Sequence, residues 1–177
     1  MIFFVQDQFV EHYTGGAELT TEAIMEKSLF PCNKIIASQL NPDIMKRHKN
    51  DFWIFGNFTD LSSDCILYAA KNLNYSIIEY DYKYCFYRSP GKHILSQGEC
   101  NCHQTNRGKL ISIFFHSEKA LWWMSQRQME VYYELYPFLK NKRSRVLSSV
   151  FSDETLKFIS DLDTSKKNNK WLNQAIP

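Results

Sequence analysis

The chain has 177 residues, the size of one ordinary domain with a sizeable hydrophobic core. Hydrophobic residues make up 44% of it and aromatic residues 15%, which excludes an intrinsically disordered chain. The net charge of +2 does not indicate a nucleic-acid-binding protein, because binding to a phosphate backbone is usually driven by a strongly basic face.

The N-terminus has no basic region followed by an apolar core and a small-residue cleavage site, so we expect no secretory signal. No stretch approaches the ~20 apolar residues that a membrane-spanning helix needs. We therefore expect a cytoplasmic protein without a transmembrane segment. The five cysteines are then reduced thiols or metal ligands, and not a disulfide framework.

Strand and helix patterns alternate through the first half of the chain. Short apolar runs predict strands over Met1–Val5, Asn33–Gln39, Asp51–Phe55 and Tyr75–Tyr80. Helices are predicted over 17–28 and 61–73, with a shorter one over 44–49. This alternation is typical of a parallel sheet with helices on its faces, so the predicted fold is α/β and Rossmann-like.

The second half returns to this alternation after an irregular stretch, Asp81–Gly108. A helix is predicted over 110–117, although its apolar centre could also form a strand, and further helices over 125–136 and 154–162. Strands are predicted over 120–124 and 145–150. We expect one Rossmann-like domain over 1–162, followed by a polar tail or linker stub over 163–177.

Gly15 and Gly16 follow the first predicted strand and precede the first predicted helix. Glycine allows close approach of the backbone to a ligand, and a helix N-terminus presents free N–H groups to an anion. The motif therefore fits a nucleotide- or sugar-phosphate-binding loop. A tight turn with a helix cap explains the same residues.

The irregular stretch contains Cys85, His93, Cys100, Cys102 and His103. Thiolates and imidazoles are the ligands that Zn²⁺ prefers, and a bound metal would order so long a segment. The expected ligands are Cys85, Cys100, Cys102 and one histidine, for which we take His103. The site would be structural, with ordinary thiols as the alternative, since C-x-C-H is not the common zinc spacing.

Gly15-Gly16-Ala17-Glu18 resembles the G-G-A-E loop of the retaining glycosyltransferase family with the GT-B fold, which includes sucrose and glycogen synthases. Ala120–Gln126 is similar to that family's strand-then-serine segment, and Arg145–Val150 resembles the strand leading to its second domain. The resemblance implies an N-terminal, acceptor-side half of such an enzyme. The donor-binding E-x(7)-E motif of the family lies in a C-terminal domain, which this chain lacks, so the chain alone is expected to be inactive.

The resemblance also implies substrates and site residues. The substrates would be a nucleotide-sugar donor and a glycan or lipid-linked acceptor, with no cofactor for the chemistry. Gly15 and Gly16 would contact the donor diphosphate or the transferred sugar, and Glu18 either the substrate or only the helix dipole.

Further site residues are expected where the strands end. Asn57 at the third strand would bind substrate, and Asp81 and Lys83 after the fourth would take catalytic roles or form a solvated salt bridge. The alternative function is a non-catalytic carbohydrate- or nucleotide-binding module with a metal-stabilised loop.

Overall fold

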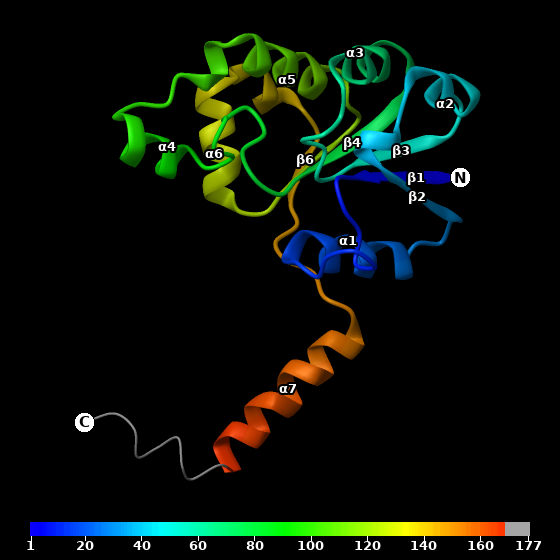
Figure 1. Ribbon diagram of the computed structural model, residues 1–177, viewed down its shortest axis with the longest axis vertical. Coiled ribbons are helices and arrows are strands. Elements are labelled where there is room, and N and C mark those ends of the chain that lie inside the picture. The colour runs from blue at the N-terminus through cyan, green and yellow to red at the C-terminus, as the bar shows by residue number, and fades with distance from the viewer. Residues whose placement is uncertain (169–177) are drawn as a thin grey trace.

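A computed structural model describes residues 1–168 of the chain, with side chains through Leu162 (Figure 1). In this part of the chain six parallel strands form one sheet, in the order β2-β1-β3-β4-β5-β6. The strands are β1 (Ile2–Gln6), β2 (Cys32–Ile36), β3 (Phe52–Phe55), β4 (Asn74–Glu79), β5 (Leu121–Trp123) and β6 (Ser144–Val146). The predicted Rossmann-like α/β fold is confirmed.

Helices lie on both faces of this sheet. The helices of the described residues are α1 (Gly16–Glu26), α2 (Pro42–Arg47), α3 (Ser63–Asn72), α4 (Pro90–Gln97), α5 (Asn106–Ser117), α6 (Gln126–Leu135) and α7 (Asp153–Asn168). Of these, α7 extends away from the sheet beyond α1 (Figure 1). Three 3₁₀ turns are η1 (Ala37–Gln39), η2 (Cys102–Gln104) and η3 (Pro137–Asn141). Figure 1 shows α1 on one face of the sheet, α2, α3, α5 and α6 on the other, and α4 beyond α6 at one end of the molecule. None of the described helices is long and apolar enough to cross a membrane.

The strand order changes direction at β1. The chain passes from β1 outward to β2, then returns to place β3 on the other side of β1, after which β4, β5 and β6 follow in sequence. In doubly wound sheets the crossovers on the two sides of such a switch point lie on opposite faces, which opens a crevice at the carboxyl ends of the two strands. The fold therefore points to the ends of β1 and β3 as the binding edge.

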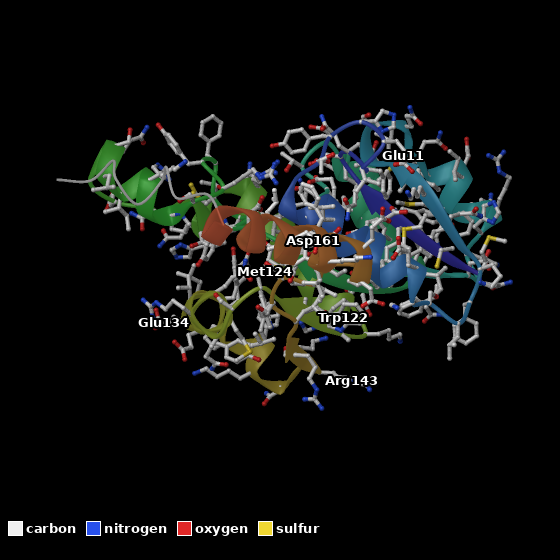
Figure 2. The ribbon with its side chains drawn as sticks, turned by 90° about the horizontal axis from the view of Figure 1, so that it is seen from below. Glu11, Trp122, Met124, Glu134, Arg143 and Asp161 are labelled. Atoms are coloured by element: carbon white, nitrogen blue, oxygen red, sulfur yellow. The ribbon has the colours of Figure 1, made fainter. Side chains whose placement is uncertain are left out.

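The main core lies on the sheet face covered by α3, α5 and α6. Buried aromatic side chains dominate it: Tyr75 stacks on Phe114 of α5, Phe55 meets the same ring edge-on, and Trp53 stacks on Phe55. Trp123 packs against Tyr132 of α6. Fully burying a side chain of this size contributes roughly 1.5–3 kcal/mol. On the α1 face a smaller cluster forms around Phe4, Ile54 and Ile78, and Trp122, labelled in Figure 2, packs against it.

Two segments differ from the sequence prediction. The stretch predicted as irregular contains α4, whose start is capped by Ser89 with Pro90 in its first turn, and which ends at Gly98 with φ +82°. Only His93 of α4 is buried, so the helix has no apolar stripe that periodicity could reveal. At the other end α7 continues to Asn168, past the predicted boundary at 162, and residues 169–177 of the predicted tail lie outside the described residues.

Glu118, between α5 and β5, provides a pH-dependent prediction. Its side chain is fully enclosed, and Lys142 Nζ lies 3.8 Å from Oε2, too far for a good hydrogen bond. Burial raises the pKa of Glu118 to about 7, against an opposing effect of Lys142. The unfolded carboxyl ionises near pH 4.5 while the folded one stays protonated, so stability falls as pH rises from about 4.5 to about 7.

Glu118→Gln should therefore stabilise the protein by about 1–3 kcal/mol at pH 8 and by little at pH 4.5. Urea unfolding at the two pH values measures this difference. The matched control is Glu130→Gln, because Glu130 is half-exposed and its carboxylate lies 3.8 Å from the Arg127 guanidinium. This control should change the free energy of unfolding by no more than about 0.5 kcal/mol at either pH. Equal pH dependence of Glu118→Gln and the wild type would contradict the prediction.

Candidate functional site

A polar pocket opens at the carboxyl ends of β1 and β3, the edge that the strand order indicates. It has a volume of about 270 Å³, and its lining residues are Asp7, Gln8, Tyr13, Glu18, Asn57, Thr59, Asp60 and Arg88. These side chains come from the loops that follow β1, β3 and β4, apart from Glu18, which lies in the first turn of α1. A small pocket in which convergent polar groups meet at a strand-end switch point is the expected form of a ligand site in this fold.

Asp7 joins two of these loops. Its Oδ2 accepts a hydrogen bond from the Thr59 amide at 2.9 Å and its Oδ1 one from the Asp60 amide at 3.0 Å. The Asp7 amide in turn donates to the Asn57 carbonyl at 2.5 Å. A carboxylate has about four acceptor positions, so Asp7 can hold the loop after β3 and still accept a hydrogen bond from a ligand hydroxyl.

The glycine loop borders this pocket without lining it. Gly15 is the N-cap of α1, and a Cβ at that position would lie 2.6 Å from Glu18 Oε2 and 2.7 Å from the Tyr13 ring. A Cβ on Gly16 would meet nothing within 4 Å. A side chain at position 15 would therefore displace the Glu18 and Tyr13 side chains that line the pocket. Of the four residues predicted to bind substrate, Glu18 and Asn57 line the pocket, and donor contacts from Gly15 and Gly16 stay a prediction.

Asp81 and Lys83, predicted as catalytic, form an ion pair at the end of β4. Lys83 Nζ is fully buried, donates to Asp81 Oδ1 at 2.5 Å and lies 5.4 Å from the centroid of the Phe58 ring. Neither residue lines the polar pocket. The buried Lys83 amine holds the Asp81 carboxylate in place through this ion pair. The catalytic role of both residues stays a prediction.

Glu79 is the last residue of β4, and its side chain is fully buried beside Lys83. Its Oε1 accepts hydrogen bonds from the Tyr132 hydroxyl at 2.6 Å and from the Lys83 amide at 2.8 Å. Burial raises the pKa of Glu79 to about 7, which the charge of Lys83 opposes and that of Asp81 reinforces. Lys83 therefore offsets part of the cost of a buried carboxylate.

Only Glu18 and Asn57 of the lining residues were predicted from the sequence, and Arg88 is the residue furthest along the chain that the prediction missed. Its Nε donates to Asp81 Oδ2 at 2.6 Å, and its guanidinium also donates to Asn57 Oδ1, so it connects the loops after β3 and β4. Its backbone has φ +54°, a left-handed conformation that costs a non-glycine residue roughly 1–2 kcal/mol. Nothing in the composition of the segment reveals this turn.

The second cluster contains three cysteines and one histidine: Cys85, His93, Cys100 and Cys102. His93 Nδ1 lies 3.6 Å from Cys85 Sγ and 3.3 Å from Cys102 Sγ, and the Cys85 and Cys100 sulfurs are 3.7 Å apart. A tetrahedral zinc ion with bonds of about 2.3 Å to sulfur and 2.0 Å to nitrogen requires its ligand atoms about 3.5–3.8 Å apart. These three distances are close to that requirement and all four ligand atoms lie within 4.8 Å of one another, so the cluster could hold a metal ion.

The histidine of this cluster is His93 and not His103, which corrects the predicted ligand set. His103 follows Cys102 in the 3₁₀ turn η2, where consecutive side chains point about 120° apart, so it does not face the same way as Cys102. α4 brings His93 to the sulfurs instead. The three predicted cysteines are all members.

Groups around the cluster orient its ligands. His93 Nε2 is 3.1 Å from Gln97 Oε1, one turn further along α4, and donation to that oxygen leaves the Nδ1 lone pair facing the sulfurs. The Phe86 amide donates to Cys102 Sγ at 3.5 Å. Burial, with a smaller contribution from Cys85, raises the pKa of Cys100 to about 12, and a divalent cation would reverse this by stabilising the thiolate.

Comparison with known proteins finds no relative: no protein-family model matches the chain, and neither a curated protein nor a solved structure is significantly similar to it. The case for a function therefore rests on the polar pocket and the cysteine–histidine cluster. The pocket offers hydrogen bonds to a small polar ligand, and the cluster offers four ligands to a metal.

Proposed function

We propose that the chain is the acceptor-binding half of a glycosyltransferase with a GT-B fold. The observation that carries the proposal is the polar pocket at the switch point, with the Gly-Gly-Ala-Glu segment beside it. Its carboxylates, amide, guanidinium and tyrosine ring are the groups that hydrogen-bond and stack on sugars. A C-terminal domain would bind the nucleotide-sugar donor, and the sugar would pass to a glycan or lipid-linked acceptor.

The charge of the pocket favours the acceptor over the donor diphosphate. Asp7, Glu18 and Asp60 contribute three carboxylates, whereas the charge of the single cation, Arg88, is balanced by Asp81. A diphosphate would meet net repulsion there. Sugar hydroxyls both donate and accept hydrogen bonds and carry no charge, so they suit this arrangement.

In such a transfer the residues of this chain bind and orient the acceptor. Asp7 is positioned to accept a hydrogen bond from an acceptor hydroxyl, and Arg88 and Asn57 to fix neighbouring hydroxyls. Holding the two reactants in a reactive geometry is itself a large part of catalysis. This role needs no cofactor.

We also propose that Cys85, His93, Cys100 and Cys102 bind a structural zinc ion. Four protein ligands complete a tetrahedral site and leave no open position for a reacting water or substrate, as is typical of structural zinc. Cys85 lies between β4 and α4, and His93 lies in α4. Cys100 precedes η2, and Cys102 is its first residue. The ion would thus cross-link the segment that was expected to be irregular.

Titration of the ¹⁵N-labelled chain with neutral mono- and oligosaccharides and with nucleotide sugars tests the proposal. We expect millimolar binding of a neutral sugar, with chemical-shift changes at the amides after β1 and β3. Asp60→Ala should weaken binding about tenfold, and Asp64→Ala, an exposed carboxylate in the first turn of α3, should leave it unchanged. Shift changes elsewhere, or no binding, would contradict the proposal, and tighter binding of the nucleotide would favour a nucleotide-binding module.

A further inference from the structure

Arg88 connects the two sites. Its side chain lies in the polar pocket, while its backbone lies between two ligands of the cluster, Cys85 and His93. The Arg88 amide donates to the Cys85 carbonyl at 2.9 Å, and the Arg88 carbonyl accepts from the Tyr82 amide at 3.3 Å. A displacement of Cys85 would therefore move the residue that carries the guanidinium.

The turn at Arg88 needs this support. A non-glycine residue with φ +54° keeps that conformation only where the surrounding structure holds it. Phe86, the first side chain after Cys85, is 80% exposed and adds little burial, whereas Tyr87 packs on the ring of His93 with centroids 4.8 Å apart. The turn is fixed by the hydrogen bonds of the Arg88 backbone to Cys85 and Tyr82, by the start of α4, and by the contacts of the guanidinium.

We propose that metal binding at the cluster holds Arg88 in the polar pocket, so that the pocket takes its binding form when the metal is bound. The inference rests on the proposed function, because it takes the ligand of the pocket to be a sugar. It adds that sugar binding in the pocket depends on metal binding at the cluster. The coupling passes through one short backbone segment from Cys85 to Arg88, then through the guanidinium to Asn57.

Such coupling is reciprocal, which gives a sharp test. If the metal helps hold Arg88 against Asn57, then the contact with Asn57 must strengthen metal binding by the same factor. Asn57 lies after β3, in a loop separate from the segment that contains the metal ligands, and its side chain accepts a hydrogen bond from the Arg88 guanidinium. Asp60 lines the same pocket, and the contacts found for it involve its backbone amide and Asp7.

The experiment measures the zinc affinity of the full chain by competition with a chelating dye. Asn57→Ala should weaken zinc binding about threefold or more relative to the wild type, and the matched control Asp60→Ala should leave it unchanged. Equal affinities of the two variants would overturn the inference, as would failure of the wild type to bind zinc.

A second measurement avoids any effect of the substitution on folding. In the zinc-loaded wild type, the Arg88 Nε–H proton should exchange with solvent at least tenfold more slowly than in the chelated protein, while amides of β1 and β3 stay protected. An unchanged exchange rate would overturn the inference. Sugar titration is independent of both results, because its failure would remove the proposed ligand and leave the zinc–Arg88 coupling intact.

Discussion

Removal of zinc should lower the melting temperature of the chain by about 10 °C or more. Without the cation, the three thiols and the imidazole no longer cross-link Cys85, α4 and η2, and we expect the loss of about 3–5 kcal/mol of stability. For a domain of this size, 1 kcal/mol corresponds to about 2–4 °C. Elemental analysis of the purified protein should give about one zinc per chain, and thermal melting before and after chelation measures the shift.

The two histidines give a matched pair for the same experiment. His93→Ala should abolish zinc retention because the proposed site takes His93 Nδ1 as a ligand, whereas His103→Ala should retain zinc because His103 is not a member of the cluster. Cys32→Ser, which removes a thiol outside the cluster, should also retain it. Protein that carries no zinc and melts at the same temperature with and without chelator would rule out the metal site.

Lys83→Met should destabilise the chain by about 3 kcal/mol at pH 8. The substitution keeps the length of the side chain but removes the buried charge that offsets the Glu79 carboxylate. Asp81 keeps its ion pair with Arg88, so the unpaired charge falls mainly on Glu79. Urea unfolding gives the free-energy change, with the exposed Lys71→Met as the control that should lie within about 0.5 kcal/mol of the wild type.

The same variant has a defined pH dependence. Because the pKa of Glu79 is already raised to about 7 and Lys83 opposes that rise, loss of Lys83 raises it further. Below this pKa Glu79 is protonated and the missing cation matters less, so the destabilisation should shrink as pH falls from 8 to 6. Adding Glu79→Gln should restore most of the loss at pH 8. A Lys83→Met defect that is independent of pH and survives the double substitution would show that packing alone explains it.

Much of the fold could be predicted because a buried parallel strand leaves a local signal. Phe52–Phe55 is a short apolar run bounded by Asp51 and Gly56, and Asn74–Glu79 contains Tyr75, Ile77 and Ile78. Burial on both faces of the sheet favours such runs. The helix α4 left no such signal, because it lies at the end of the molecule with a single buried residue. Its caps, Ser89-Pro90 and Gly98, were the only evidence for it.

The site could be predicted only in part, for a related reason. The three cysteines could be predicted as metal ligands from their residue type alone. Asn57 could be predicted as a site residue because it follows the end of a strand. Which histidine completes the cluster depends on α4 and on the direction of a 3₁₀ turn, and neither is visible in the spacing Cys100, Cys102, His103. Arg88 enters the pocket through a left-handed turn on a residue that rarely adopts one, so no sequence rule pointed to it.

Neighbouring strands β4 and β5 are separated by about 40 residues of chain, and this has a consequence for folding kinetics. A zinc cross-link from Cys85 to Cys102 shortens the effective connection to about 25 residues, and by the logarithmic dependence of closure entropy this favours strand pairing by only about 0.4 kcal/mol. That corresponds to about a twofold change in folding rate. Most of the contribution of a bound metal would therefore act on unfolding, so zinc at this site would set how long the native state lasts far more than how quickly it forms.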